Sequence, residues 1–281
     1  MRVWLLMIFL RKIHAHKQRT ILIRNRYHTY EKLIMFWNKK KKLPITKEDK
    51  VWVDEDLKWL RAEFGEEHFM EIRTVTPTKG FYDRTFDGTE KDAEFILKRT
   101  MELMNIRDNE IKLEFFSDQP IEMADGTILT TPADINGSWD SASGTYQQKE
   151  NETIISIERG QLKNPISLIA TISHELSHQI LLGENRIEEN DEFLTDFTAI
   201  TYGFGIFIGN SRFNFSSFNT NGGFGWQSSS QGYLPEQIIA YTMAWLSKER
   251  NEKTDFSQYL NKSMNKYFEQ SFEYLTEQKT E

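Results

Sequence analysis

One stretch of the chain, residues 164–183, constrains the fold more than any other. Asn164 is a favourable helix N-cap, Pro165 suits the first helical position because its missing N–H has no partner there, and Gly183 is a typical helix end. Between them, apolar residues recur at the spacing of one helix face: Ile166, Ile169, Ile172, Leu176 and Ile180. The sequence therefore predicts an amphipathic helix with one side in the core.

This helix carries the sequence His174-Glu175-Leu176-Ser177-His178, an H-E-x-x-H motif. Residues four apart lie above one another on a helix, so both imidazoles can converge on one metal ion while Glu175 stands beside them. A polar helix face without any metal is the simpler alternative. The chain has only 6 histidines, however, and two of them bracket a glutamate on a capped helix. We therefore expect a metal site.

A zinc ion held by two histidines needs at least one further protein ligand, and a catalytic site keeps another position open for water. The chain has no cysteine and no histidine beyond His178, so a downstream ligand would have to be a carboxylate. Glu192 and Asp196 lie four apart on a second expected helix, 191–205, and segment 184–191 can turn the chain to bring it beside the first. We expect Glu192 to bind the metal and Asp196 to accept the other ring N–H of a ligand histidine.

H-E-x-x-H followed by E-x-x-x-D resembles the gluzincin metallopeptidases, the thermolysin-like clan. The resemblance covers residues 164–196 and implies a zincin-like fold with one Zn²⁺ ion bound by His174, His178 and Glu192. It further implies that Glu175 is the general base of peptide hydrolysis and that Asp196 supports a ligand histidine. The chain departs from the pattern in one respect, because it has no later histidine to stabilise the oxyanion.

In such a site Glu175 takes a proton from the attacking water and returns it to the leaving amine. The oxyanion needs positive help besides the metal. The candidates for that role are Tyr202, Arg212, Tyr233 and Tyr241, and the alternative is that the metal acts alone. We favour Tyr233 as a catalytic residue, because it follows segment 209–232, which is rich in glycine, serine and aromatic residues and which we expect to form an ordered loop beside the cleft. An ordinary packed side chain is the alternative for each candidate.

Two functions of different classes follow from this pattern. The first is a zinc-dependent metallopeptidase with a peptide or protein substrate and Glu175 as its base. The second is a non-catalytic metal-binding or protein-interaction domain that retains the site. No phosphate loop, dinucleotide fingerprint or internal repeat is visible, and neither the physiological substrate nor the oligomeric state follows from the pattern.

The remaining pattern predicts an α+β fold, with a small, mostly antiparallel sheet packed on the H-E-x-x-H helix and a mainly helical C-terminal half. Alternating apolar residues predict a strand at 111–116, another strand is expected at 70–78, and 143–149 and 152–158 can pair as a hairpin. Further helices are expected at 54–64, 89–104, 235–249 and 254–277.

The charge pattern divides the chain near residue 50. Residues 1–50 contain 14 Lys and Arg against 3 Asp and Glu, a net charge of +11, whereas the remainder carries −18, which leaves −7 for the whole chain. We expect residues 1–49 to be a basic arm that could be disordered. Residues 50–281 are expected to form one zincin-like domain, with an α/β part at 50–183 and a helical part at 184–281.

The favoured interpretation of the arm is a solvated tail, since charge runs often have no other role. The alternative is a weak contact with a membrane or another anionic partner through residues 1–45, and no nucleic-acid partner is expected. The apolar run Val3–Leu10 is too short to span a bilayer and lacks a small-residue cleavage site. We therefore expect a cytoplasmic protein.

Overall fold

The computed structural model describes residues 42–107, 111–117, 121–122, 128–129, 144–149, 152–216 and 234–277. Leu43–Glu281 forms one compact unit, distinct from Met1–Lys42. Most of the basic arm expected over residues 1–49 therefore lies outside the described residues. The compact unit begins at Leu43, earlier than the predicted boundary at residue 50.

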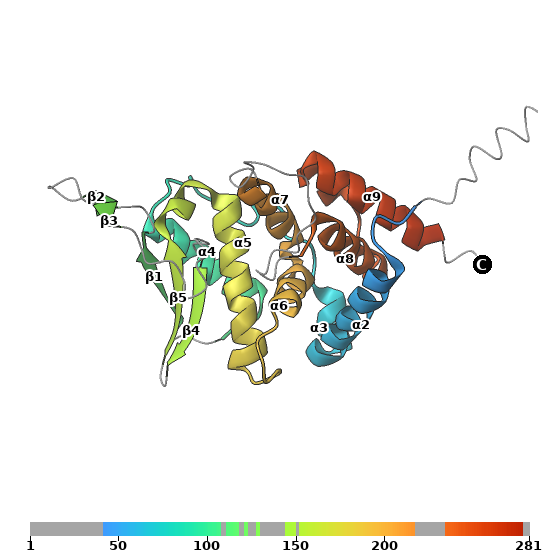
Figure 1. The fold of residues 1–281 in the computed structure, drawn as a ribbon, viewed down its shortest axis with the longest axis horizontal. Helices are drawn as coiled ribbons and strands as arrows, with labels where there is room; N and C mark the ends of the chain where they lie inside the picture. Colours follow the sequence, from blue (N-terminus) through green and yellow to red (C-terminus); the bar gives the residue numbers. More distant parts are fainter. Residues whose placement is uncertain are drawn as a thin grey trace, which may run out of the picture. The chain divides into compact units, whose positions relative to one another are not determined.

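Helices make up most of this unit (Figure 1). The α-helices are α2 (Lys47–Phe64), α3 (Glu66–Glu71), α4 (Glu90–Leu103), α5 (Pro165–His178), α6 (Glu192–Ala199), α7 (Gly205–Ser216), α8 (Glu236–Glu249) and α9 (Lys262–Glu277). Short 3₁₀ helices lie at η1 (Arg159–Lys163) and η4 (Asp255–Tyr259), and π-helical turns at η2 (Gln179–Gly183) and η3 (Ile200–Phe204). The combination of these helices with a small sheet is compatible with an α+β class.

Reciprocal capping boxes fix the start of two long helices. At α2 the Thr46 hydroxyl accepts a hydrogen bond from the Asp49 N–H, and the Asp49 carboxylate accepts one from the Thr46 N–H. With this cap the helix begins at Lys47, whereas the apolar pattern predicts a helix that begins at residue 54. Thr89 and Asp92 form the same arrangement at α4, which begins where the sequence predicts a helix.

The sheet is mixed rather than mostly antiparallel. Its three strands are β1 (Ile111–Phe116), β5 (Glu152–Glu158) and β4 (Gly144–Lys149), in the order β1-β5-β4. β4 and β5 form the predicted antiparallel hairpin, whereas β1 pairs with β5 in parallel. A separate antiparallel pair joins β2 (Ile121–Glu122) to β3 (Ile128–Leu129).

β5 is the central strand because it is apolar on both faces. Ile154, Ile155 and Ile157 are all buried, which is typical of a strand with neighbours on each edge and cover on each side. The strand expected at 70–78 does not form. There α3 continues to Glu71, and residues 72–76 follow in irregular conformation.

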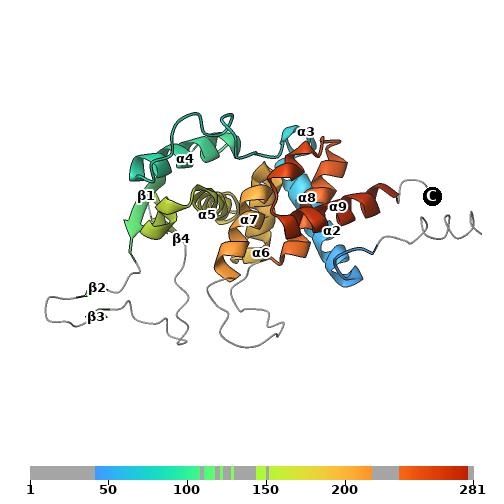
Figure 2. The same cartoon turned by 90° about the horizontal axis from the view of Figure 1, so that it is seen from above.

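α5 occupies the middle of the unit. It lies between the sheet and the pair α6 and α7 (Figures 1 and 2), and it contacts β4, β5, α4, α6 and α7. The Asn164 side chain accepts hydrogen bonds from the N–H groups of Ile166 and Ser167, so the predicted N-cap forms. Even small polar residues of α5 such as Ser173 and Ser177 are fully buried, and each bonds to a backbone carbonyl of the same helix.

The helix expected at 191–205 is interrupted. α6 ends at Ala199, and the π turn η3 contains Gly203 at a φ of 96°, a conformation that favours glycine. The backbone N–H of Val75 bonds to the Gly203 carbonyl there, so the break is where the chain after α3 meets the helical half. The loop expected at 209–232 is also wrong in its first part, because α7 continues to Ser216. Its remainder lies outside the described residues.

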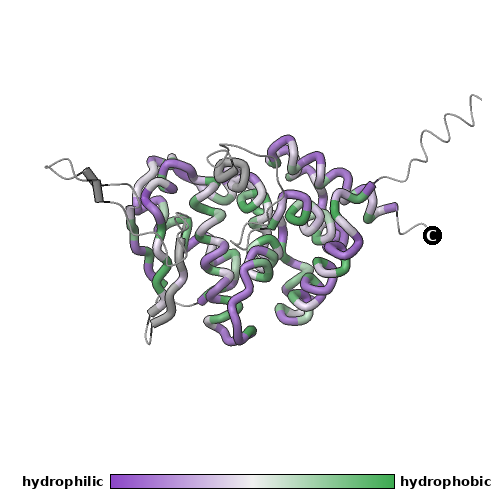
Figure 3. The backbone as a smooth tube through the Cα atoms, in the orientation of Figure 1, coloured by the Kyte–Doolittle hydropathy of each residue, from purple (hydrophilic) through white to green (hydrophobic). Residues whose placement is uncertain are grey.

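A single cluster of buried apolar side chains connects the sheet side to the helical half. In Figure 3 the hydrophobic segments gather along α5 and the helices beside it, whereas α9 is mostly hydrophilic. α8 and α9 pack against each other, and α8 also contacts α2 and α7. Among the described residues, no helix combines the length and the apolar character needed to cross a membrane.

Candidate metal centre

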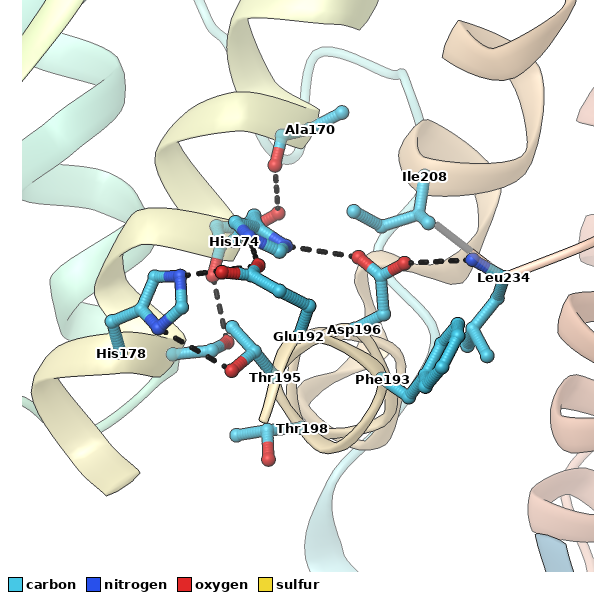
Figure 4. A network of polar contacts seen from close by, with 12 residues as sticks. Ala170, His174, His178, Glu192, Phe193, Thr195, Asp196, Thr198, Ile208 and Leu234 are labelled. Atoms are coloured by element: carbon cyan, nitrogen blue, oxygen red, sulfur yellow. Dashed lines mark hydrogen bonds and ion pairs between the residues drawn. The ribbon is translucent and has the colours of Figure 1, made fainter. Parts of the chain in front are cut away.

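Three potential metal ligands converge where α5 faces α6 (Figure 4). His174 and His178 come from successive turns of α5, and Glu192 is the first residue of α6. His174 Nε2 lies 3.1 Å from Glu192 Oε2, and His178 Nε2 lies 3.6 Å from the same oxygen. The three ligand atoms lie within 4.8 Å of one another.

These separations suit one small divalent cation. Ligands at zinc distances in a tetrahedral arrangement lie about 3.4 Å from one another. The two measured nitrogen–oxygen separations, 3.1 and 3.6 Å, lie on either side of that value. Two imidazoles and one carboxylate are also a donor set that zinc accepts, with further positions left for water or substrate.

His174 is oriented by a buried carboxylate. Its Nδ1 lies 2.9 Å from Asp196 Oδ1, and the Asp196 side chain is completely buried. The second oxygen of Asp196 accepts the backbone N–H of Leu234 at 3.3 Å, just before α8. Burial alone lowers the pKa of His174, but hydrogen bonds to Asp196 and Glu192 outweigh it and raise this pKa well above its ordinary value. A proton and a metal ion therefore compete for His174 Nε2.

His178 has a different environment. Its Nδ1 lies 3.4 Å from the hydroxyl of Thr195, a fully buried residue of α6. The ring of Tyr146, from β4, stacks on the His178 ring at a centroid distance of 5.9 Å. The Tyr146 hydroxyl donates to Gln179 Oε1 at 2.9 Å, so the tyrosine is tied to the turn that follows His178. These contacts join the edge strand β4 to the end of α5, directly beside His178.

Glu192 is the most exposed of the three ligands. About 40% of its side chain is accessible, against 14% for His174 and 8% for His178. The Asn190 side-chain amide donates to Glu192 Oε1 at 2.7 Å, which leaves Oε2 directed at both histidines. The hydrogen bond with His174, and then the contact with His178 at 3.6 Å, lower the pKa of Glu192 far below its ordinary value, so the carboxylate is ionised.

Glu175 is the fourth polar residue of the motif, and it is only 5% exposed. Burial raises the pKa of its carboxyl group, and the nearby Glu192 acts in the same direction, while His174 and His178 oppose the shift. A buried carboxyl group with a raised pKa, in electrostatic contact with both histidines, is a candidate general base.

The local sequence explains why α6 presents these groups together. Asp191 caps α6 by accepting hydrogen bonds from the N–H groups of Phe193 and Leu194, so Glu192 occupies the first helical position. Residues three and four positions further on then share its face. Those residues are Thr195 and Asp196, and one helical turn therefore contacts both histidines.

The structure does not bring two of the predicted oxyanion candidates to the site. Tyr241 is fully buried, and its hydroxyl donates to Asp54 Oδ1 on α2 at 2.6 Å. Tyr202 is buried against the rings of Phe64 and His68. Both are packing residues because their apolar surroundings and partners lie away from the metal ligands. Tyr233 and the side chain of Arg212 lie outside the described residues.

Sequence analysis alone missed three contacts of the site. Thr195 follows Glu192 by three residues, so helical spacing contained a signal for it. Asn190 precedes Glu192 by two residues, a position from which its short amide side chain can reach the Glu192 carboxylate. Tyr146 is separated from the metal helix by the hairpin and by η1, and no local pattern connects it to His178.

Comparison of the chain with protein-family models, with curated proteins and with solved structures finds no match. What the site does must therefore be inferred from its own residues. The described structure contains a cluster of His174, His178 and Glu192 that could hold a metal ion.

Proposed function

We propose that the protein is a zinc-dependent metallopeptidase with a zincin-like fold, which hydrolyses peptide bonds in a peptide or protein substrate. The observation that carries the proposal is the convergence of His174, His178 and Glu192, with which the buried carboxyl group of Glu175 interacts electrostatically. Three ligands with one partly exposed side leave room for water and substrate, as a catalytic zinc site requires.

In this proposal each residue of the site has one role in hydrolysis. When bound, a zinc ion supplies a Lewis acid that polarises a carbonyl group and makes water more acidic. Glu175 accepts a proton from the attacking water, whose oxygen forms the new bond to the carbonyl carbon. The C–N bond then breaks and Glu175 returns the proton to the leaving amine. The products are a carboxylic acid and an amine, and Glu175 ends as it began.

The ligand side chains are held ready for this role. Asp196 accepts the Nδ1 hydrogen of His174, which directs the other ring nitrogen toward Glu192. A carboxylate in this position fixes the ring and makes the ligand more basic. The Asn190 amide restrains Glu192 in the same sense. Because these contacts come from the chain itself, the site needs little rearrangement to accept an ion.

The experiment uses the full chain, purified without chelators. We expect about one zinc ion per chain by elemental analysis and cleavage of casein or of a peptide library. Glu175→Gln preserves shape but removes the base, so it should retain the zinc and lose about 100-fold or more of the rate. Glu188→Gln, in the exposed loop before α6, is the matched control and should cleave like the wild type.

The outcomes separate the candidate functions. Zinc binding without cleavage by the wild type, across a diverse library, would reject the peptidase and favour the non-catalytic metal-binding domain. Equal cleavage by Glu175→Gln and the wild type would reject the assigned base. A wild-type protein that takes up no zinc would reject the metal centre itself.

A further inference from the structure

The hydroxyl of Thr195 makes two contacts that define its hydrogen-bonding role. It lies 2.8 Å from the carbonyl oxygen of Asp191, one turn back on α6, and 3.4 Å from Nδ1 of His178. A threonine hydroxyl has a single hydrogen to donate. The Asp191 carbonyl can only accept, so that hydrogen is committed to it. Toward His178 the Thr195 oxygen is therefore an acceptor.

This commitment determines how the imidazole of His178 presents itself. An acceptor at Nδ1 favours the ring form whose hydrogen is on Nδ1, and it leaves the lone pair on Nε2. Nε2 is the nitrogen that faces Glu192 Oε2, at 3.6 Å. We propose that Thr195 is a positioning residue for the metal centre, which holds His178 in the ring form that can bind zinc. The inference rests on the metal site of the proposed function.

Thr195 completes a division of roles along one turn of α6. Glu192 points toward the two histidines, Thr195 accepts from His178, and Asp196 accepts from His174 (Figure 4). The two supports differ in strength. His174 has a carboxylate partner at 2.9 Å, whereas His178 has a hydroxyl partner at 3.4 Å, near the outer limit for such a bond. His178 is accordingly the less firmly held of the two imidazoles.

The alternative is that the buried hydroxyl of Thr195 only forms a hydrogen bond within its own helix. The chain provides a control for that alternative. Thr198, one turn further along α6, is fully buried and donates to the Leu194 carbonyl at 2.8 Å. Figure 4 shows its side chain away from both histidines. Thr195→Val and Thr198→Val thus remove the same type of helix bond and keep the same volume, but only the first removes an acceptor from His178.

The test measures zinc affinity and the ring form of His178 separately. Affinity is obtained by competition with a chromophoric chelator, and the position of the ring hydrogen from ¹⁵N shifts of the metal-free protein. Thr195→Val should bind zinc about 10-fold more weakly, at the low end of the range for partners of metal ligands. It should also shift the neutral His178 ring toward the form with its hydrogen on Nε2. Thr198→Val should change neither, and Thr195→Ser should restore both.

Equal zinc affinity and an unchanged ring form in Thr195→Val, relative to Thr198→Val, would overturn the proposal. Thr195→Ala gives the same readouts if the valine variant does not fold. Because neither measurement uses peptide cleavage, a protein that binds zinc but hydrolyses nothing leaves the test intact. If the wild type binds no zinc, the proposed function fails, and the ring form still decides the role of Thr195.

Discussion

His174 and Asp196 are joined by a hydrogen bond of 2.9 Å between an imidazole of the candidate metal centre and a carboxylate that is completely buried. Asp196 also accepts from the Leu234 backbone, so it needs both of its oxygens as acceptors. An asparagine of the same shape has only one acceptor oxygen. This relationship between side chain and ligand makes Asp196 a sensitive position beside the proposed ion.

The first prediction concerns Asp196→Asn. Either His174 or the Leu234 N–H loses its acceptor, so zinc affinity should fall about 10-fold to 100-fold, and the free energy of unfolding by about 1–3 kcal/mol. Chelator competition measures the first quantity and urea denaturation the second. Asp255→Asn removes an exposed charge outside the site and is the control. Wild-type zinc affinity in Asp196→Asn would show that the contact does not support the ligand.

The second prediction concerns Asn190→Ala, which removes the hydrogen bond to Glu192 Oε1 and leaves all three proposed ligands in place. Asn190 is exposed, so the stability of the fold should not change. The lost bond, 2.7 Å long, is one between a neutral donor and a carboxylate at the surface. We expect zinc to bind about threefold to tenfold more weakly. Glu189→Ala, the exposed neighbour, should bind zinc as the wild type does, and identical affinities for the two variants would contradict the assignment.

The third prediction is a pH dependence set by Asp92. Burial tends to raise the pKa of this carboxyl group, but hydrogen bonds from Tyr82 and Thr89, and from the Asp87 backbone, outweigh it and lower the pKa to about 2. A depressed pKa stabilises the folded state above the ordinary value for aspartate, near 4, and this contribution is lost as the pH falls toward 2.

Asp92→Asn should therefore unfold about 1–2 kcal/mol more easily at pH 7, because one amide oxygen cannot replace a carboxylate that both caps α4 and accepts from Tyr82 at 2.5 Å. The difference from the wild type should shrink as the pH falls below 4. Urea denaturation over that range measures it. Asp83→Asn, at an exposed position, is the control. A difference that stays constant with pH would contradict the role given to the Asp92 charge.

The fourth prediction compares two glycines at positive φ. A Cβ at Gly203, where φ is 96°, would overlap the Arg73 carbonyl, whereas a Cβ at Gly65, where φ is 80°, would meet no atom within 4 Å. Gly65→Ala should therefore cost only the backbone strain, about 1–3 kcal/mol. Gly203→Ala should be clearly more destabilising, since the chain after α3 must also move. Thermal unfolding gives both values, and equal losses would contradict the close approach at Gly203.

Features with a local cause could be predicted from the sequence. Asn164 and Pro165 begin α5 where expected, because capping depends only on neighbouring residues. The convergence of His174, His178 and Glu192 also follows from local rules, since four-residue spacing sets two ligands on one helix and a short connection brings the third beside them.

The remaining features depend on distant partners. β1 pairs with β5 in parallel across a long intervening segment, and nothing within either strand specifies that choice. In the sequence Tyr241 is one candidate to stabilise the oxyanion, yet the partner of its hydroxyl is Asp54, far away in the sequence. The break at Gly203 likewise reflects a contact with Arg73 and Val75 rather than the helical pattern around it.

The chain has no cysteine, so no disulfide can tie its helices together. An ion between His178 and Glu192 would do so, closing the connection Gln179–Asp191 into a ring as a covalent cross-link does. Loss of the ion would then leave α5 and α6 joined at the site by hydrogen bonds alone, such as that between His174 and Asp196. The exposed stretch around Glu188 would then be cut more readily by a protease, so the digestion pattern would report whether the ion is bound.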